Sequence, residues 1–278
     1  MSSERISPEA RNLNVPFQLC PIACVDHGTG PAILLWSSML MDADMFSAQI
    51  EALSQHFRVL AVDPPGQGQS GAVGAHFSLD DCGDAAIAVL DAAGEETAMI
   101  AGNSWGGMVA INVAARYPDR CKAIAVMNSS AAPAPFAHHI EFGGMPLMVR
   151  LFGITRLLSA IATRSFLGTT AHRERPDLRA FIARKLGGLD RRSVVHIVRS
   201  VLLGRADQRG LLSQIKMPTL IIGGTEDRIF PPAGQHTMQQ SIKGSRLLMV
   251  QAGHFAPLEA ADEVSAALTQ FAQECLAQ

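Results

Sequence analysis

The sequence lacks the features that mark several large classes of protein. Its five cysteines are odd in number and scattered, with neither a disulfide framework nor zinc-ligand spacing, so we expect reduced thiols. Its longest apolar runs, such as Ala32–Trp36, fall far short of the ~20 residues that cross a membrane. The first 17 residues contain no apolar stretch of the kind found in a secretion signal. These absences predict a cytoplasmic protein with no membrane partner and no bound metal.

Charge is also scarce, and it is unevenly distributed. The formal net charge is −2, so the whole chain gives no argument for nucleic acid as a partner. Residues 137–216, however, contain 14 Lys and Arg against 5 Asp and Glu, an excess of +9 that leaves −11 for the rest of the chain. Two interpretations are open: these basic residues pair with carboxylates on a solvated face, or some line a cleft and attract an anionic substrate.

Strand-like and helix-like segments alternate along most of the chain, which predicts an α/β fold with a mainly parallel sheet covered by helices. We expect a first pair of strands within Phe17–Val25. Further strands are expected at residues 32–36, 58–62, 97–101, 123–127, 219–222 and 246–250. Between about residues 131 and 215 only amphipathic, helix-like segments occur. We therefore predict a helical subdomain at 131–215, inserted into a core formed by residues 1–130 and 216–278.

A serine between two glycines stands where a predicted strand turns into a predicted helix, in the segment Gly102-Asn103-Ser104-Trp105-Gly106. This G-x-S-x-G pattern is typical of a sharp turn that holds a nucleophilic hydroxyl above a sheet. Its glycines stand where neighbouring backbones come too close for side chains. The pattern is short enough to arise by chance, so the rest of the chain must supply its partners.

A serine hydroxyl is a poor nucleophile until a base takes its proton and a carboxylate orients that base. The chain offers both partners in the order Ser, acid, His: Asp227 and His254 each follow an apolar, strand-like segment. We predict that Ser104, Asp227 and His254 are the catalytic residues. Glu226 is the alternative acid.

The negative charge that develops on a carbonyl oxygen requires two donors in fixed positions. We assign one to the backbone N–H of Trp105, directly after the nucleophile. The other is assigned to the N–H of Met39, in the loop that follows the strand at 32–36. The hydroxyls of Ser37 and Ser38 either add a donor or satisfy the backbone of that loop.

A glycine-rich segment, Gly66-Gln67-Gly68-Gln69-Ser70-Gly71, formally matches the fingerprint of dinucleotide binding. That fingerprint opens a helix directly from its strand, whereas here two prolines precede it and residues 72–74 continue as loop. We therefore expect no cofactor and interpret the segment as a rigid turn beside the active site.

Together these motifs resemble those of the α/β-hydrolases, over nearly the full length outside the helical insertion. The resemblance is carried by Asp63-x-x-Gly66-x-Gly68-x-Ser70, Gly102–Gly107, Gly224-x-x-Asp227 and Gly253-His254-Phe255. It implies an eight-stranded, mainly parallel sheet flanked by helices, with the insertion forming a cap that shapes the substrate pocket. Around Trp36–Met39 and Met45-Phe46 the chain is similar to 3-oxoadipate enol-lactonase-like hydrolases, although Ser37-Ser38 replace the usual His-Gly.

The resemblance also implies an enzyme, a serine hydrolase that cleaves a carboxylic ester or lactone through an acyl-enzyme. Relatives that act on haloalkanes or epoxides carry Asp at the position of Ser104, which leaves acyl chemistry for this chain. Two alternatives stay open: hydrolysis of a carbon–carbon bond in a vinylogous diketone on the same triad, and a ligand receptor on a hydrolase scaffold. The expected partner is a small-molecule ester or lactone, with an anionic substrate and a homo-oligomer left open.

Overall fold

A computed structural model describes residues 11–276 of the chain, without the side chains of residues 137, 138 and 141. Residues 1–10, which belong to the predicted core and to the segment searched for a secretion signal, lie outside the described residues, as do residues 277–278. The strands are β1 (Arg11–Val15), β2 (Ile22–His27), β3 (Ala32–Trp36), β4 (Arg58–Val62), β5 (Ala98–Asn103), β6 (Cys121–Met127), β7 (Thr219–Gly224) and β8 (Arg246–Val250).

The eight strands form one sheet in the order β1-β2-β4-β3-β5-β6-β7-β8. β2 pairs antiparallel with β1 and β4, and every other pairing is parallel. The predicted mainly parallel, eight-stranded sheet is therefore confirmed. The first strand pair was placed wrongly, because β1 ends at Val15 and β2 begins only at Ile22. Pro16 and Pro21 lack the N–H groups that a strand ladder requires, so the chain turns between them.

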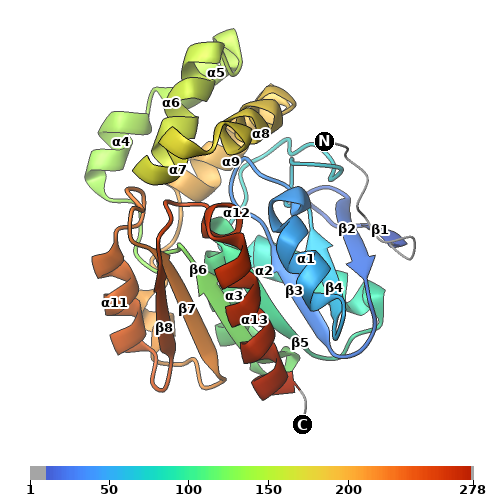
Figure 1. Ribbon diagram of the computed structural model, residues 1–278. Coiled ribbons are helices and arrows are strands. Elements are labelled where there is room, and N and C mark those ends of the chain that lie inside the picture. Colours follow the sequence, from blue (N-terminus) through green and yellow to red (C-terminus); the bar gives the residue numbers. More distant parts are fainter. Residues whose placement is uncertain (1–10, 277–278) are drawn as a thin grey trace.

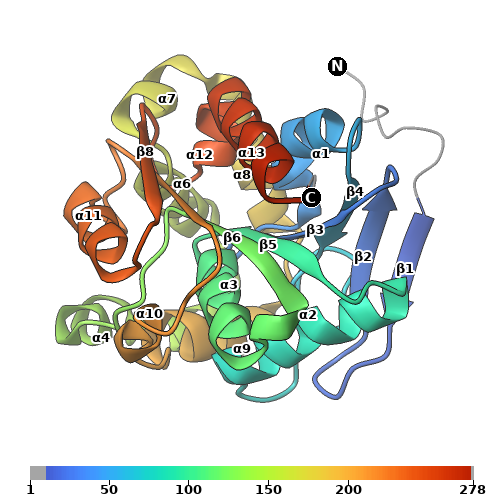
Figure 2. The same ribbon diagram turned by 90° about the horizontal axis from the view of Figure 1, so that it is seen from below.

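The central strands are buried over their whole length, as expected for parallel strands covered on both faces. The core helices are η1 (Ala43–Phe46), α1 (Ser47–Leu53), α2 (Leu79–Ala93), α3 (Trp105–Arg116), η2 (Pro118–Arg120), α11 (Pro232–Ser241), α12 (Ala256–Glu259) and α13 (Ala261–Leu276). α1 and α13 pack together on one face of the sheet, and α2 and α3 pack together on the other (Figure 2). The catalytic candidates stand in loops at the carboxyl ends of the parallel strands, between these layers.

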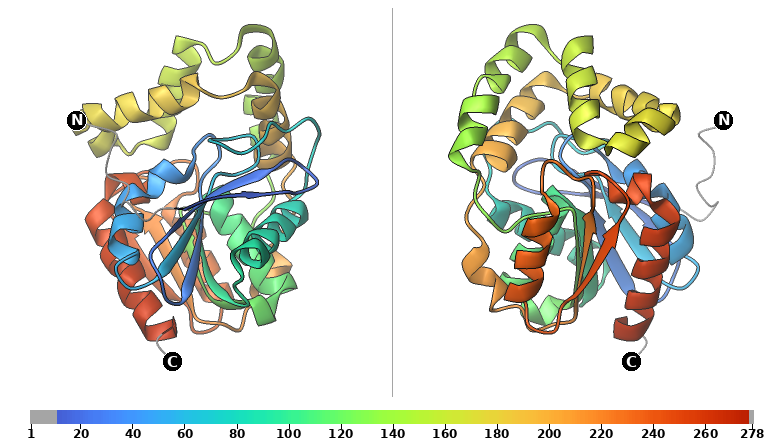
Figure 3. Two further views of the ribbon diagram at one scale, coloured as in Figure 1. Left: turned by 90° about the vertical axis from the view of Figure 1, so that its right-hand side faces the viewer. Right: turned by 60° about the vertical axis from the view of Figure 1, so that its left-hand side comes forward.

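Within the described residues, the chain between β6 and β7 contains helices and loops but no strand. The helices are α4 (Phe136–Phe142), α5 (Met145–Phe152), α6 (Arg156–Phe166), α7 (Thr169–Glu174), α8 (Pro176–Gly187), α9 (Arg191–Ile197), the π-helical η3 (Val198–Leu203) and α10 (Arg209–Leu212). Most of them lie over one end of the sheet (Figures 1 and 3). In the described part of the chain, no helix combines the length and apolar character needed to cross a membrane.

We expect Gly106→Ala to destabilise the fold. A Cβ at position 106 would overlap the carbonyl oxygen of Trp36, where the start of α3 passes the end of β3. Relief requires a backbone shift, so the free energy of unfolding should fall by about 1–3 kcal/mol or more. Gly234→Ala in α11 is the matched control, because no atom lies within 4 Å of an added Cβ there and alanine favours a helix by about 0.5–1 kcal/mol. Urea unfolding measures both, and similar effects at the two positions would contradict the argument.

Candidate active site

Ser104 occupies the turn between β5 and α3. Its backbone conformation, with φ of +55° and ψ of −109°, is one that residues other than glycine rarely adopt. Hydrogen bonds to the neighbouring strand end hold Ser104 there: its N–H donates to the carbonyl of Met127 at 2.8 Å, and its carbonyl accepts from Ser129 Oγ at 2.6 Å. A Cβ at Gly102 would overlap the backbone of Gly106. The close approach that the glycine spacing predicted is therefore present.

The three predicted catalytic side chains form one hydrogen-bonded chain. His254 Nε2 lies 2.8 Å from Ser104 Oγ, and His254 Nδ1 lies 2.9 Å from Asp227 Oδ2. An ionised carboxylate can only accept, so Nδ1 carries the imidazole proton and the lone pair of Nε2 faces the serine hydroxyl. The exposed fractions are only 7% for Ser104, 2% for His254 and 4% for Asp227. The arrangement suits transfer of the hydroxyl proton to the imidazole.

The environment of Asp227 keeps its carboxylate ionised. Its Oδ1 accepts the backbone N–H groups of Ile229 and Phe230 at 2.8 and 3.0 Å, and its Oδ2 also accepts from Asn128 at 3.0 Å. Burial opposes ionisation, but the interaction with His254 and these hydrogen bonds outweigh it and hold the pKa of Asp227 below its ordinary value. A fixed negative charge therefore faces the imidazole.

Glu226, the alternative acid, has different partners. Its carboxylate accepts from the N–H and the hydroxyl of Thr170, at the start of α7, at 2.8 and 2.6 Å. These hydrogen bonds lower the pKa of Glu226. Asp227, and not Glu226, is the residue hydrogen-bonded to His254, while Glu226 joins the helical segment to the core.

The two predicted oxyanion donors are backbone N–H groups in positions that leave the N–H unpaired. The N–H of Trp105 opens α3, where an N–H has no acceptor within the helix. Among the described residues, the N–H of Met39 has no hydrogen-bond acceptor. The Ser37 hydroxyl lies 3.3 Å from the carbonyl of Met41, and the Ser38 hydroxyl lies 3.2 Å from that of Asn103. The Ser37 hydroxyl thus bonds a backbone carbonyl of its own loop, and the Ser38 hydroxyl bonds one at the end of β5.

Gln67, which the sequence analysis assigned no role, fixes the loop that carries Met39. Its Nε2 donates to the carbonyls of Ser38 and Met41 at 3.1 and 2.7 Å, and its Oε1 accepts the N–H of Leu40. Three hydrogen bonds from one buried side chain hold four consecutive residues in place. The turn that contains Gln67 therefore holds the loop that carries Met39.

The same turn does not open a helix, since α2 begins only at Leu79. The N–H of Gly66 donates to the carbonyl of Gly71 at 3.0 Å, which closes the turn on itself. As for metals, the described residues contain no group of three or more His, Cys, Asp or Glu side chains placed to hold an ion.

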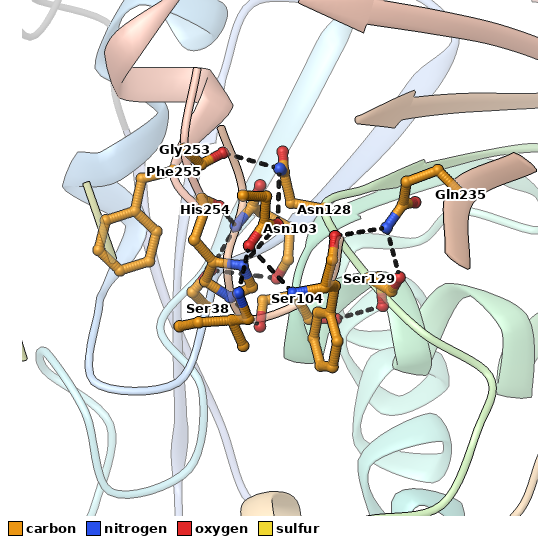
Figure 4. A network of polar contacts seen from close by, with 12 residues as sticks. Ser38, Asn103, Ser104, Asn128, Ser129, Gln235, Gly253, His254 and Phe255 are labelled. Atoms are coloured by element: carbon orange, nitrogen blue, oxygen red, sulfur yellow. Dashed lines mark hydrogen bonds and ion pairs between the residues drawn. The ribbon is translucent and has the colours of Figure 1, made fainter. Parts of the chain in front are cut away.

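Two buried asparagines that the sequence analysis missed hold the histidine loop (Figure 4). Asn103 Nδ2 donates to the carbonyl of His254 at 3.0 Å, and Asn128 Nδ2 donates to that of Gly253 at 2.9 Å. Asn128 donates to Asp227 through the same nitrogen, so it links Asp227 to the loop that carries His254. The available signal was a polar residue at the carboxyl end of each of two apolar strands.

Asn128→Ala should lower kcat about 10–100-fold with little change in KM. It removes a hydrogen bond to a charged group, worth about 1.5–3 kcal/mol, and that bond orients the acid rather than the substrate. Asn112→Ala is the matched control, because this buried amide on α3 bonds Asp80 instead. Steady-state kinetics on both variants, with urea unfolding as a check on folding, measure the effect. Equal losses of kcat in the two variants would contradict the assigned role.

The helical segment packs directly on the histidine. Phe166, at the end of α6, stacks on the His254 ring with centroids 5.9 Å apart, and its carbonyl accepts the His254 N–H at 2.8 Å. Phe230 lies against another side of the imidazole, at 5.4 Å between centroids. Glu259 accepts from the N–H groups of Gly168 and Gly253 at 2.8 and 2.9 Å. The rings of Phe166 and Phe230 form an apolar wall, which limits the access of water to the imidazole and strengthens its hydrogen bonds.

Comparisons with known proteins bear on the fold and on the class of enzyme. The family model described as the alpha/beta hydrolase fold matches residues 31–261. A pimeloyl-[acyl-carrier protein] methyl ester esterase of Neisseria meningitidis is 30% identical over 226 residues, which cover 81% of this chain and 86% of that protein. The 3-oxoadipate enol-lactonase 1 of Acinetobacter baylyi is 28% identical over 229 residues, or 82% of this chain and 84% of that protein.

Among solved structures, a thermophilic esterase from Thermogutta terrifontis superposes with a TM-score of 0.88 at 24% identity, covering 96% of this chain and 100% of that one. The family match spans the elbow, the acid loop and the histidine loop. The predicted fold, the hydrolase class and the resemblance to esterases and lactonases are confirmed. The chain belongs to the alpha/beta hydrolase fold family.

Proposed function

We propose that this chain is a serine hydrolase that cleaves a carboxylic ester or a lactone. The observation that carries the proposal is the buried chain from Ser104 through His254 to Asp227, with distances of 2.8 and 2.9 Å. A neutral imidazole held by a carboxylate is the base that a serine hydroxyl needs. The esterase and lactonase relatives support the same substrate class.

In the first half-reaction, Ser104 Oγ attacks the carbonyl carbon while His254 Nε2 takes its proton. The N–H groups of Trp105 and Met39 stabilise the negative oxygen of the tetrahedral intermediate. His254 then gives the proton to the leaving oxygen, the carbon–oxygen bond breaks, and Ser104 keeps the acyl group. In the second half, His254 deprotonates a water molecule that attacks the acyl carbon. The acid leaves and Ser104 recovers its proton.

Turnover of a panel of substrates by the purified protein tests this proposal. The panel contains p-nitrophenyl esters, lactones and vinylogous diketones, at matched concentrations. We expect ester or lactone hydrolysis that titrates with a serine-directed phosphonate. Turnover of the diketones alone would assign carbon–carbon bond hydrolysis instead. Tight binding of a panel member without turnover of any would favour the receptor.

We also propose that residues 131–215 form a cap over the site, with the core in residues 1–130 and 216–278. Phe166 stacked on His254 and Thr170 hydrogen-bonded to Glu226 support this division, because both join the helical segment to the catalytic loops. Lys185 pairs with Asp42 and Asp44 on the core side of the same junction. These contacts support a substrate site between the proposed cap and the carboxyl ends of the strands.

Among the residues that the structure describes, the arginines of the proposed cap form no direct ion pair with a carboxylate of the core. In the described structure its arginine ion pairs are all local, as in Arg175 with Asp177 and Arg209 with Asp207. Arg205 differs from the rest because it is only 6% exposed and has no carboxylate partner among the described residues. Its guanidinium donates to the backbone carbonyls of Ala132, Leu202 and Pro133.

Arg205 lies close to His254, the proposed catalytic base. Its guanidinium carbon is 5.4 Å from the centre of the Phe230 ring, which packs in turn on His254. Burial lowers the pKa of Arg205 to about 10, so the group is still charged at neutral pH. A buried charge without a counter-ion favours an anion nearby. We propose that the substrate carries an anionic group that Arg205 attracts.

Arg205→Gln should raise KM for a carboxylate-bearing ester about 10–100-fold, the value of a hydrogen bond to a charged group, and leave its neutral methyl analogue nearly unchanged. Raising the ionic strength should lower kcat/KM for the anionic ester only, because salt screens the attraction. Arg209→Gln is the matched control, since that exposed residue pairs with Asp207. If both substrates respond alike to the substitution and to salt, Arg205 is structural and the substrate is neutral.

A further inference from the structure

The exposed apolar side chains of this protein are gathered in one region. Of the residues that the structure describes, every large hydrophobic residue that counts as exposed lies on α4, α5 or α6, with exposed fractions of 54–78%. They are Phe136, Ile140, Leu147, Met148, Leu151, Phe152, Leu157 and Ile161. Single exposed hydrophobics are ordinary on a protein surface, but eight of them on three consecutive helices indicate an interaction site. We call these eight residues the apolar face.

The spacing shows that the apolar face follows the outer sides of the helices. On α5, Leu147 and Leu151 are four residues apart, and on α6 so are Leu157 and Ile161, which aligns each pair along one side of its helix. The opposite sides are used internally, with Val149 and Phe166 buried. α5 and α6 lie at the opposite end of the molecule from the last turn of α13 (Figures 1 and 3). No described element covers them there.

The charges beside the apolar face are positive and unpaired. Arg150, Arg156 and Arg164 lie on α5 and α6, are exposed, and take part in no ion pair of the described structure. The sequence of the three helices contains one acidic residue, Glu141, whose side chain lies outside the described residues. An exposed apolar surface with free guanidinium groups complements an anionic, amphiphilic partner.

We propose that the apolar face binds the surface of an anionic lipid bilayer. Leucine and phenylalanine side chains would enter the boundary between headgroups and acyl chains, while the arginines meet lipid phosphates. A second copy of this chain is a poorer occupant, because a two-fold contact would bring the unpaired arginines of both copies together. The proposal revises the expectation of no membrane partner, which rested on the lack of a spanning segment. It does not depend on the proposed catalytic function.

Co-sedimentation of the full-length protein with vesicles tests the proposal. We expect binding to vesicles that contain about one third phosphatidylglycerol, and at least tenfold weaker binding to pure phosphatidylcholine. The formal net charge is −2, so a preference for anionic vesicles has to come from a local cationic patch. Binding to the anionic vesicles should also weaken as salt is raised. Failure of the wild-type protein to bind either vesicle would overturn the proposal.

Variants locate the binding surface. Leu151→Ser with Phe152→Ser, and separately Arg150→Gln with Arg156→Gln, should each weaken binding to anionic vesicles at least tenfold. Arg173→Gln with Arg209→Gln is the matched control, since it removes the same charge from exposed arginines outside α4–α6 and should change binding less than twofold. All variants should keep the wild-type melting temperature, because the altered side chains are exposed.

Two outcomes of the variant experiment would overturn the proposal. One is a control variant that binds as weakly as the others, which would indicate general electrostatics rather than the apolar face. The other is a wild-type protein that does not bind vesicles and forms a stable dimer in analytical ultracentrifugation. The double substitution Leu151→Ser with Phe152→Ser would dissociate this dimer. That result would assign the apolar face to a second copy of the chain.

Discussion

Ser104→Ala should lower kcat for ester hydrolysis about 10⁵–10⁶-fold and leave folding unchanged. Without the hydroxyl there is no acyl-enzyme, and the oxyanion donors alone supply only a small residual acceleration. Stability should hold because the only described hydrogen bond of Oγ is the one to His254. Alanine also has a Cβ, so the positive φ of residue 104 costs the same in both proteins.

The measurement is a progress curve with p-nitrophenyl acetate at high enzyme concentration, with the melting temperature as a check. Ser241→Ala is a suitable control, since this exposed hydroxyl on α11 bonds only the carbonyl of Thr237. A serine-directed phosphonate should add its mass to the wild-type protein and not to Ser104→Ala. Activity of Ser104→Ala within a few-fold of the wild type would refute the nucleophile.

Asp227→Asn should lower kcat on the order of 10⁴-fold. An asparagine amide at this position can donate to Nδ1, which favours the imidazole tautomer with its proton on Nε2, the wrong one for accepting from Ser104. The volume of the side chain barely changes, so the loss of activity would come from the changed position of the imidazole proton and not from altered packing. Kinetics under single-turnover conditions would show the loss in the acylation step.

Glu226→Gln is the informative comparison, since Glu226 is the adjacent acid. Its partners are the N–H and hydroxyl of Thr170, so the substitution should weaken the contact between α7 and the core and change kcat less than tenfold. The opposite pattern, with a mild effect of Asp227→Asn and a large loss of kcat in Glu226→Gln, would assign the catalytic carboxylate to Glu226.

The sequence by itself determined the parallel strands of the sheet, the elbow and the order of the candidate catalytic residues. Strands are apolar because they are buried, and positions 102 and 106 are glycine because backbones approach closely there. Both patterns extend over only a few residues, so they can be recognised in the sequence alone. The carboxyl ends of parallel strands meet at one edge, which is why Ser104, Asp227 and His254 could be grouped. Their catalytic roles stay a proposal.

Only the tertiary structure decided what holds those residues in place. The contacts of Gln67 with the Met39 loop, of Asn128 with Asp227 and of Phe166 with His254 join segments 26 to 99 residues apart in the chain. A hydrogen bond or ring contact across such a distance leaves no periodicity in the sequence, because it depends on where loops meet after folding. Which of Asp227 and Glu226 contacts the imidazole was of this kind. Two adjacent carboxylates look alike in sequence, and the backbone of the acid loop turns one toward the imidazole and the other toward α7.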